Sequence, residues 1–312
     1  MPFDIATGEP IAKKDPSLAS WSKTYADLVD LYMEKDPKMV VINPATVIGS
    51  HLCEVFDKYP ERTFDVGISE EHAAVFASGM AVNGLHPYLS AYSTFLQRSY
   101  DEISHDIARM DANVTMLIDR VGLPGQDGET HEGIFDVAYL NSIPNIAICM
   151  AKDQIEANDL FNFSTKYVHP LAIRYPRGKT LIQERKEPKD IKLGEWCIEN
   201  NGDDTAIITY GPIVNEVVNK FKKHTVINAI FQKPLDIDLL KTLLNKKQIV
   251  IYDVYGTEEG FATIVKTTLD SLNYRGTVKS LCVPSSFIKH GSVDSQIKAL
   301  HISLEDLDKL LK

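Results

Sequence analysis

The feature that most constrains the fold is an alternation of short apolar runs with segments of helical periodicity. Between residues 19 and 178, apolar runs such as 39–47 and 113–119 are separated by stretches such as 21–36, in which apolar side chains recur at helical spacing. The run Val114–Ile118 is mostly apolar, which is typical of a strand buried on both faces. We therefore predict a domain over residues 19–178 in which helices cover both sides of a parallel sheet.

A second unit of the same kind is predicted over residues 195–312. It includes an apolar run at 205–211 and a strand expected over 225–231, each beside a helical pattern. The charged segment 179–194 lacks strong periodicity and is interpreted as an interdomain linker. Residues 1–18 contain three prolines and no periodicity, and they are also interpreted as a linker. The predicted fold class is α/β, with two doubly wound, mostly parallel-sheet domains.

Composition excludes several classes of function. The net charge is -10 over 312 residues and the basic residues form no long stripe, so nucleic acid is not an expected partner. The four cysteines lie far apart without a C-x-x-C pair, which favours reduced thiols over disulfides or a zinc site. No apolar run approaches about 18 residues, and the N-terminal residues lack a signal-peptide pattern. We therefore expect a cytoplasmic protein with no membrane contact and no bound metal of its own.

Two adjacent carboxylates, Glu70 and Glu71, begin a helix of small apolar residues. Acids in a first turn favour the helix dipole and Ser69 is a good N-cap residue, so a purely structural role is an open alternative. The helix that follows has almost no polar face, which predicts burial on all sides. A carboxylate at the head of such a helix is partly desolvated and needs a partner or a proton.

Further polar side chains follow the predicted strands, where ligands bind in open parallel sheets. Arg120 and Arg177 lie near Gly-rich turns, an arrangement that presents a guanidinium to a phosphate or carboxylate, although surface ion pairs are the commoner role of arginine. Asp127 and His131 follow Arg120 in one loop. His131 has no second ligand at metal-binding spacing, so a hydrogen-bonding or acid/base role is the better interpretation.

Common nucleotide and hydrolase motifs are absent from the sequence. There is no G-x-S-x-G elbow, Walker A loop or G-x-G-x-x-G fingerprint. The aromatic residues Tyr92 and Phe95 are by default core residues. Residue patterns alone therefore predict a two-domain α/β protein with an anion-binding polar site.

Four motifs resemble those of one known family. The sequences DVGISEEHA, YSTFLQR, DRVGLPGQDGETHEGIFD and RYPRG, within residues 65–178, closely resemble the C-terminal half of the 1-deoxy-D-xylulose-5-phosphate synthases, which are thiamine-diphosphate enzymes of the transketolase superfamily. The resemblance extends over essentially the whole chain. It implies a pyrimidine-binding domain at 19–178 and a transketolase C-terminal domain at 195–312. The segment PFDIATGE, within 1–18, resembles the linker that follows the diphosphate-binding domain, so the chain is expected to begin in mid-protein.

The resemblance also implies a reaction and roles for the residues of the cofactor site. Pyruvate condenses with glyceraldehyde 3-phosphate and loses carbon dioxide, in a step that supplies isoprenoid, thiamine and pyridoxal biosynthesis. Glu70 would exchange a proton with the N1′ atom of the aminopyrimidine of thiamine diphosphate. Phe95 would stack on that ring, and Tyr92 and Arg98 would line the cofactor pocket.

The same resemblance implies an acceptor site beside the cofactor. Arg120 and Arg177 would hold the acceptor's phosphate, because a guanidinium fork suits a phosphate dianion. Asp127 and His131 would face its hydroxyl and aldehyde end, with Tyr92 beside them, and His131 would join Glu70 as a catalytic residue.

Two departures from the family pattern limit what the chain is expected to do alone. The GDG motif that holds the diphosphate and Mg²⁺ is absent, since NNGDDT at 200–205 has a different order and lies in the other domain. The segment 255–261, YGTEEGF, replaces a Gly-rich turn, so the second domain is expected to be divergent. We expect Mg²⁺ and the diphosphate to be held by a missing N-terminal domain or subunit, the isolated chain to be inactive, and the complete enzyme to be a homodimer.

Two alternatives stay open from the sequence. The chain could be the C-terminal subunit of a split transketolase, which transfers ketol groups without decarboxylation. It could also be a non-catalytic dimerisation partner, although the intact set of site residues argues against that role.

Overall fold

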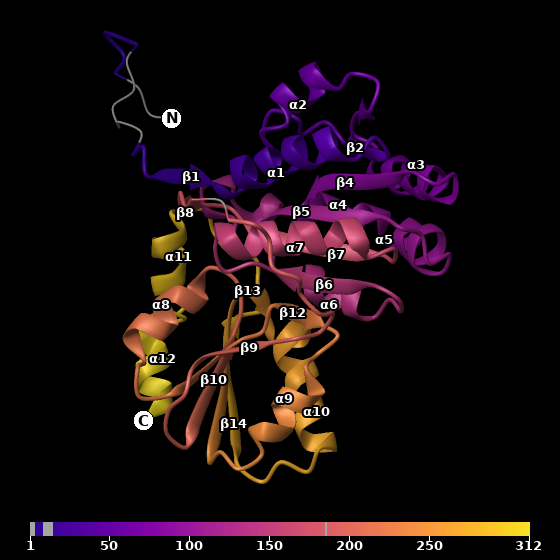
Figure 1. Cartoon of the computed structure of the whole chain (residues 1–312). Helices are drawn as coiled ribbons and strands as arrows, with labels where there is room; N and C mark the ends of the chain where they lie inside the picture. Colours follow the sequence, from indigo (N-terminus) through magenta and orange to yellow (C-terminus); the bar gives the residue numbers. More distant parts are fainter. Residues whose placement is uncertain (1–3, 9–14, 185) are drawn as a thin grey trace.

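The chain folds into two α/β units, each built on its own sheet (Figure 1). The computed structural model describes residues 4–8, 15–184 and 186–312, so part of the predicted linker 1–18 lies outside the described residues. Within the described residues, no helix is both long enough and apolar enough to cross a membrane.

The first sheet has seven strands, and six of them are parallel. Their order across the sheet is β12 (Phe231–Lys233), β6 (Ala147–Met150), β7 (Leu171–Pro176), β5 (Thr115–Val121), β4 (His86–Tyr92), β2 (Met39–Asn43) and β3 (Thr63–Asp65). Strand β12 pairs antiparallel with β6 and comes from the second half of the chain. The order reverses along the sheet, as in a doubly wound fold.

Both faces of the first sheet are buried by helices, as its mostly apolar strands predict. Successive strand residues point into different cores: Val41 packs with one set of helices, while Ile42 packs with the other. The first set is α1 (Trp21–Lys35), α2 (Cys53–Lys58) and α7 (Gln154–Lys166). The second set is α3 (Glu70–Val82), α6 (Asp136–Asn141) and the helical segment Ile103–Ala108, with the short α4 (Ser93–Leu96) and α5 (Tyr100–Glu102) leading into that segment.

The second sheet is also mostly parallel and covered on both faces. Its strand order is β14 (Thr277–Val283), β13 (Gln248–Thr257), β10 (Thr205–Thr209), β11 (Thr225–Asn228) and β9 (Cys197–Asn200), and only β9 is antiparallel. One face carries α8 (Ile213–Lys220), α11 (Val293–Ala299) and α12 (Leu304–Leu311), and the other carries α9 (Ile237–Thr242) and α10 (Thr263–Ser271). A separate antiparallel pair joins β1 (Leu18–Ser20) to β8 (Lys179–Leu181), the latter within the predicted linker 179–194.

The predicted fold class is confirmed, and one predicted strand is wrong. The apolar run 225–231 does not form a single strand, because it ends in the second sheet at Asn228 and enters the first sheet at Phe231. The backbone N–H of Met150 donates to the carbonyl of Ile230 at 2.9 Å, which ties the crossover to β6. Hydrophobicity alone does not distinguish one continuous strand from two short strands in different sheets.

Helix α3 corrects the expectation of burial on all sides. Ala73, Ala74 and Ala77 are fully buried against the sheet, whereas Val75 is 46% exposed and Val82 is 67% exposed. The helix lies at the margin of the first unit (Figure 1), so no element of the described chain covers its outer face. An exposed apolar helix face of this kind is typical of a surface that another domain or subunit covers.

An ion pair of the first unit, closed to solvent, lies where that unit contacts the second. Arg174 on β7 donates from Nε to Asp136 Oδ2 at 2.8 Å and from Nη2 to Asp136 Oδ1 at 2.9 Å, and both side chains are fully buried. From the second domain, the Tyr255 carbonyl accepts from Arg174 at 3.4 Å, and the Tyr210 ring lies 5.5 Å from the guanidinium. The Tyr210 hydroxyl in turn donates to Asp253 at 2.7 Å, so the junction is polar at its centre.

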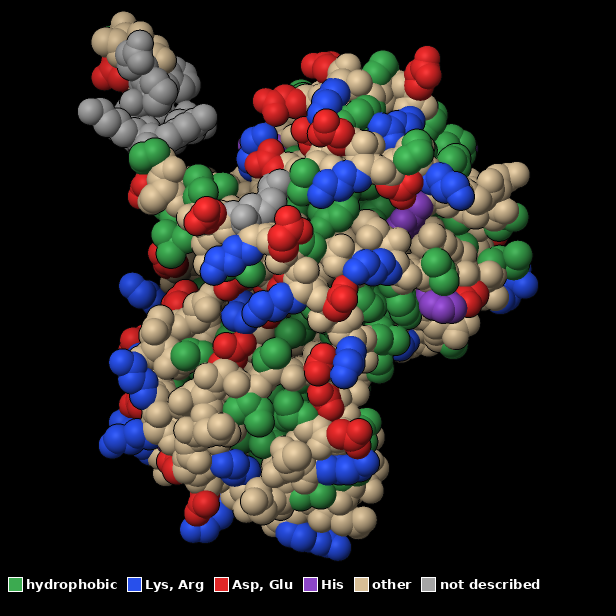
Figure 2. Space-filling view, viewed as in Figure 1, with side chains coloured by type: hydrophobic (Ala, Val, Ile, Leu, Met, Phe, Trp, Pro, Cys, Tyr) green, Lys and Arg blue, Asp and Glu red, His purple; other side chains and the backbone are tan. Residues whose placement is uncertain are grey.

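Charges of both signs are interspersed on the surface. Figure 2 shows Lys and Arg side chains beside Asp and Glu across the face drawn, with no basic stripe on that face. Steering of a small anionic substrate would therefore depend on local basic residues.

Removing one partner of the buried ion pair should destabilise the protein strongly. We expect Arg174→Met or Asp136→Asn alone to lower the free energy of unfolding by about 3–5 kcal/mol, because each leaves an uncompensated buried group. The double variant Arg174→Met/Asp136→Leu should recover much of that loss. Urea denaturation of the four proteins, with the exposed Lys166→Ala as a control that changes little, measures this; equal losses in the single and double variants would contradict it.

Candidate functional site

The predicted site residues come together at one edge of the first sheet. Glu70 follows β3, Tyr92 ends β4, Arg120 lies near the end of β5, and Arg177 follows β7 directly. These strands are parallel, so their carboxyl ends meet at one edge, where ligands bind in such sheets. Topology therefore brings together residues more than 100 positions apart.

Glu70 is buried at the start of α3 and is paired with an arginine. Its side chain is 3% exposed, and Arg98 Nη1 donates to its Oε2 at 2.6 Å. Arg98 Nη2 also donates to Glu71 at 3.2 Å, where the carboxylate is 41% exposed. Ser69 is the N-cap residue of α3, as the sequence indicates, but its side chain makes no cap hydrogen bond there. The expected partner of the desolvated carboxylate is therefore Arg98.

Three aromatic rings, one of them three residues before Arg98, contact one another in a row. Phe95 lies one helical turn before Arg98, and its ring stacks on Tyr92 with centroids 5.5 Å apart. His131 meets the Phe95 ring edge-on at 5.4 Å. The His131 Nδ1 atom lies 2.9 Å from the Thr130 hydroxyl. Phe95 is partly exposed, whereas Tyr92 is buried, so Phe95 is the ring that a ligand can reach.

The two predicted phosphate-binding arginines share one carboxylate. Arg120 Nη1 donates to Asp127 Oδ2 at 2.5 Å, and Arg177 Nη1 lies 2.9 Å from Asp127 Oδ1. Arg177 also donates to the Pro124 carbonyl at 3.1 Å. The Arg120 guanidinium stacks over the Tyr92 ring at 4.1 Å, which joins the arginines to the row of rings. A divalent anion matches this fork of two partly exposed cations.

Arg120 reaches this position through an unusual backbone conformation. Its φ angle is 60°, in the left-handed region that non-glycine residues rarely adopt. The Arg120 backbone N–H donates to Asp119 Oδ1 at 2.7 Å. This local bond helps to hold a strained residue at a functional site.

Asp119 is fully buried behind the arginine. Burial raises the pKa of its carboxyl from 3.8 to about 7. Its Oδ2 atom has no hydrogen-bond partner among the described residues. Burial outweighs the opposing effects of Ser22 and Arg120, so a protonated carboxyl fits this position better than a carboxylate does.

The loop that carries Asp127 and His131 is closed at its neck by two glycines. Gly122 and Gly133 exchange backbone hydrogen bonds of 2.7 Å and 3.0 Å. A Cβ atom on Gly133 would lie 2.2 Å from the Arg120 carbonyl, so no side chain fits there. The narrow neck confines the two predicted substrate-facing side chains to one short loop.

Several residues of the site were not predicted from the sequence. A Cβ atom on Gly49 would lie 1.8 Å from the Tyr92 hydroxyl and 3.3 Å from Arg120, so this glycine makes room for both. Asp119 and Gly133 were seen only as parts of a motif. The residue type of a glycine or of a carboxylate at a strand end does not indicate which distant residue it will contact in the folded chain.

The residues present fit the aminopyrimidine end of the cofactor that the family resemblance implies. A ring that titrates needs a carboxylate within reach and a flat apolar surface to stack on, and Glu70 and Phe95 supply these two groups. For the diphosphate end, the sequence has no GDG motif. Across residues 4–8, 15–184 and 186–312, no group of three or more His, Cys, Asp or Glu side chains could hold a metal ion.

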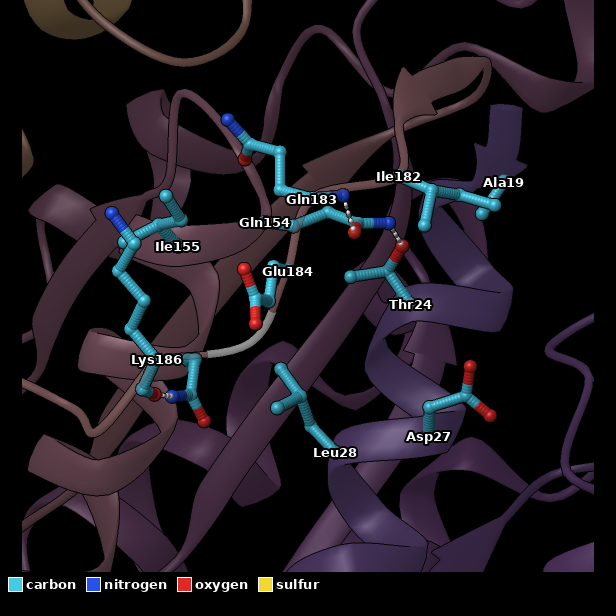
Figure 3. Close-up of a pocket in the computed structure, with 11 residues that line it drawn as sticks. Ala19, Thr24, Asp27, Leu28, Gln154, Ile155, Ile182, Gln183, Glu184 and Lys186 are labelled. Atoms are coloured by element: carbon cyan, nitrogen blue, oxygen red, sulfur yellow. Dashed lines mark hydrogen bonds between the residues drawn. The ribbon is translucent and has the colours of Figure 1, made fainter. Parts of the chain in front are cut away.

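A cavity of about 280 Å³ lies elsewhere, between α1, α7 and the segment after β8 (Figure 3). The side-chain amide of Gln154 bonds to two other elements: its Nε2 donates to the Thr24 hydroxyl at 2.9 Å, and its Oε1 accepts from the Gln183 backbone N–H at 3.0 Å. None of the predicted site residues lines it. The hydrogen bonds fasten this segment to the two helices, which is a structural role.

Two family models match the sequence and together cover most of it. Residues 17–181 match the transketolase pyrimidine-binding domain, and residues 194–307 match the transketolase C-terminal domain. Among curated proteins, the 1-deoxy-D-xylulose-5-phosphate synthase of Bacillus velezensis is 38% identical over 100% of this chain. The Listeria monocytogenes protein of the same name is 40% identical over 97% of it. The chain covers 51% of each, so it spans about half the length of these relatives.

Solved structures of low sequence identity share the fold. A chain described as a split gene transketolase, in an inactive beta4 tetramer, superposes with a TM-score of 0.80 at 20% identity, covering 92% of this chain and 95% of that one. Transketolase from Campylobacter jejuni gives a TM-score of 0.77 at 16% identity, covering 96% of this chain and 48% of that one.

The buried carboxyl of Asp119 should make stability depend on pH. Its pKa is raised in the folded chain, so between about pH 4 and 7 the folded state holds a proton that the unfolded state has lost, and the free energy of unfolding falls as the pH rises. Asp119→Asn should remove this contribution, which is at most about 1.4 kcal/mol per pH unit. Urea denaturation at several pH values measures the slope.

Asp253→Asn provides a comparison, because burial raises the pKa of Asp253 to about 6. The contribution of Asp253 to the pH dependence of the free energy of unfolding should therefore end near pH 6. An unchanged slope in Asp119→Asn would show that the carboxyl is ionised in the folded chain.

Proposed function

Because this chain belongs to the transketolase family, with residues 17–181 alone matching its pyrimidine-binding domain, we propose that it is the C-terminal portion of a thiamine-diphosphate-dependent 1-deoxy-D-xylulose-5-phosphate synthase. The reaction would condense pyruvate with glyceraldehyde 3-phosphate, with loss of carbon dioxide, to supply isoprenoid precursors. Relatives at 38% and 40% identity that carry this name support the proposal. The observation that carries it is the joined set of Glu70, Phe95 and the Arg120–Asp127–Arg177 cluster at one sheet edge.

In this proposal Glu70 holds or exchanges a proton at N1′ of the aminopyrimidine. When bound, thiamine diphosphate supplies the electron sink that allows a 2-oxo acid to lose carbon dioxide. Because Glu70 is buried, water is kept away from the carboxylate that would exchange this proton. The ion pair with Arg98 fixes the orientation of that carboxylate. Phe95 offers its partly exposed ring for stacking, with Tyr92 supporting it from behind. His131, whose ring meets the edge of Phe95, would transfer a proton at the acceptor's aldehyde.

Arg120 and Arg177 would bind the phosphate of the acceptor. In the structure the Asp127 carboxylate lies between them and neutralises part of their charge. A phosphate dianion offers more charge and more acceptor oxygens than a carboxylate, so it can take over these bonds. Asp127 would then be released to accept from an acceptor hydroxyl.

The chain would act together with a diphosphate-binding partner. It contains no GDG motif and spans about half the length of the curated relatives that it matches. The partner, as a domain or a separate subunit, would hold the diphosphate and Mg²⁺. The exposed apolar face of α3 and the 84%-exposed Ile48, in the loop after β2, are surfaces that the partner or a second copy in a homodimer would cover. Cytoplasmic location and inactivity of the isolated chain stay predictions.

A split transketolase is the second candidate. The solved chain described as a split gene transketolase, inactive beta4 tetramer, covers nearly the same span as this chain. The two enzymes differ in their donor: pyruvate for the synthase and a ketose phosphate for the transketolase. The 35–40% identity to synthases favours the first candidate. A non-catalytic partner would release no carbon dioxide with either donor.

Reconstitution tests the proposed function. The chain is mixed with the diphosphate-binding half of a synthase relative, thiamine diphosphate, Mg²⁺, pyruvate and glyceraldehyde 3-phosphate, and carbon dioxide release is followed. We expect turnover from the mixture and none from either half alone. Ketol transfer from a ketose phosphate without use of pyruvate would instead establish the transketolase.

Glu70→Gln should lower reconstituted turnover by about 10²–10⁴-fold, because an amide cannot exchange the proton. Glu71→Gln is the matched control, since Glu71 bonds to the same arginine but is exposed, and it should stay within a few-fold of the parent. Circular dichroism checks that both variants fold. Full activity of Glu70→Gln would refute the catalytic assignment.

Arg177→Lys and Arg120→Lys should weaken binding of the phosphate acceptor. Each change loses a forked, charge-assisted contact, so we expect KM for glyceraldehyde 3-phosphate to rise about 10–100-fold with KM for pyruvate little changed. Steady-state kinetics of the reconstituted enzyme measure both constants. Arg275→Lys, an exposed change in the second domain, should alter neither. Equal effects on the two substrates would place the arginines elsewhere than at the acceptor phosphate.

A further inference from the structure

The loop that carries Asp127 and His131, residues 122–133, is held by hydrogen bonds from the second domain. We call it the acceptor loop. Gln296 on α11 is 4% exposed, and its side-chain amide reaches from the second domain to Gly125 in this loop. The Ile288 backbone N–H also donates to Glu132 in the same loop. Residues 288–296 therefore contact the acceptor loop at more than one point.

A single amide satisfies both backbone groups of Gly125. The Gly125 N–H donates to Gln296 Oε1 at 2.9 Å, and Gln296 Nε2 donates to the Gly125 carbonyl at 3.3 Å. The same Nε2 donates to the Lys289 carbonyl at 2.9 Å, which ties the amide to its own domain. The Gly291 N–H donates to the Gly125 carbonyl at 3.1 Å and completes the contact. Glutamine is suited to this position because it offers a donor and an acceptor together.

Gly125 is two residues from Asp127, within one short turn. The Asp127 N–H donates to the Pro124 carbonyl at 3.2 Å, and Arg177 donates to that same carbonyl at 3.1 Å. Holding Gly125 therefore holds the turn in which Asp127 meets Arg177 and Arg120. A displacement of Gly125 would move the Pro124 carbonyl that orients Arg177, and it would move Asp127 away from the acceptor hydroxyl that this carboxylate would bind once the phosphate has taken its place.

We propose that Gln296 is a positioning residue for acceptor binding: through Gly125 it holds the Asp127 turn in register with Arg120 and Arg177. The second domain thus sets the affinity for the phosphate acceptor without touching it. The assignment of Arg120 and Arg177 to the acceptor phosphate rests on the proposed function. The hydrogen bonds between Gln296 and Gly125 do not depend on it.

Three variants separate positioning from general stability. Gln296→Leu keeps the approximate shape but loses every hydrogen bond of the amide. Gln296→Glu keeps an acceptor for the Gly125 N–H and regains a donor only when protonated. Gln232→Leu is the matched control, because Gln232 is fully buried in the same half of the chain and donates only to Ala229 and Ile230.

Amide hydrogen exchange in the full chain gives a readout that needs no turnover. We expect Gly125 and Asp127 to exchange at least about 10-fold faster in Gln296→Leu than in the parent, since a buried hydrogen-bonded contact is lost. Gln232→Leu should leave these two amides unchanged. Equal acceleration in both variants, or none in Gln296→Leu, overturns the proposal.

Kinetics of the reconstituted enzyme give the second readout. We expect Gln296→Leu to raise KM for glyceraldehyde 3-phosphate about 10-fold, with KM for pyruvate within two-fold of the parent. In Gln296→Glu the acceptor KM should fall toward the parent value between pH 8 and pH 6, as the buried carboxyl gains its proton. A fall in kcat with unchanged acceptor KM, or no pH-dependent recovery in Gln296→Glu, overturns the positioning role.

The two proposals fail in different ways. If the parent mixture shows no synthase activity, the proposed function fails, and hydrogen exchange alone then decides whether Gln296 positions the loop.

Discussion

Arg174 and Asp136 form an ion pair, closed to solvent, at the point where the two domains and the candidate site meet. Arg174 lies on β7 three residues before Arg177, and Asp136 begins α6 three residues after the loop neck at Gly133. The pair therefore joins β7, which is followed by Arg177, one of the two arginines proposed to bind phosphate, to the end of the loop that carries Asp127. Its cost in desolvation is offset only because every charged atom finds a partner, including the Tyr255 carbonyl of the second domain.

The site consists of charges that are already paired with one another. Arg98 bonds to Glu70, and Asp127 bonds to Arg120 and Arg177. Such pairing keeps the buried side chains in defined orientations without a ligand, and it means that a ligand binds by replacing a partner. If an anionic acceptor binds as proposed, it replaces the Asp127 carboxylate, and specificity for a dianion over a weaker anion would follow from that competition.

Much of the fold was predictable because it depends on local patterns. The mostly apolar run of β5 and the helical spacing in α1 indicate a parallel sheet covered on both faces, and the structure has that arrangement. The failures have one cause. The exposure of Val75 and Val82 on α3, and the crossing of β12 into the other sheet, depend on which surfaces meet, and hydrophobicity records only that a surface is apolar.

The sequence by itself determined the alternation of strands and helices, the strand-end positions of Glu70, Arg120 and Arg177, and the family to which their motifs belong. Each of these depends on residue type and short-range spacing, which are present in the unfolded chain. Only the tertiary structure decided that Arg98 pairs with Glu70, that Asp127 lies between two arginines, and that Gln296 reaches Gly125 across 171 positions. Those contacts form between segments far apart in the chain, and they exist only once two separate sheets have packed against a common junction.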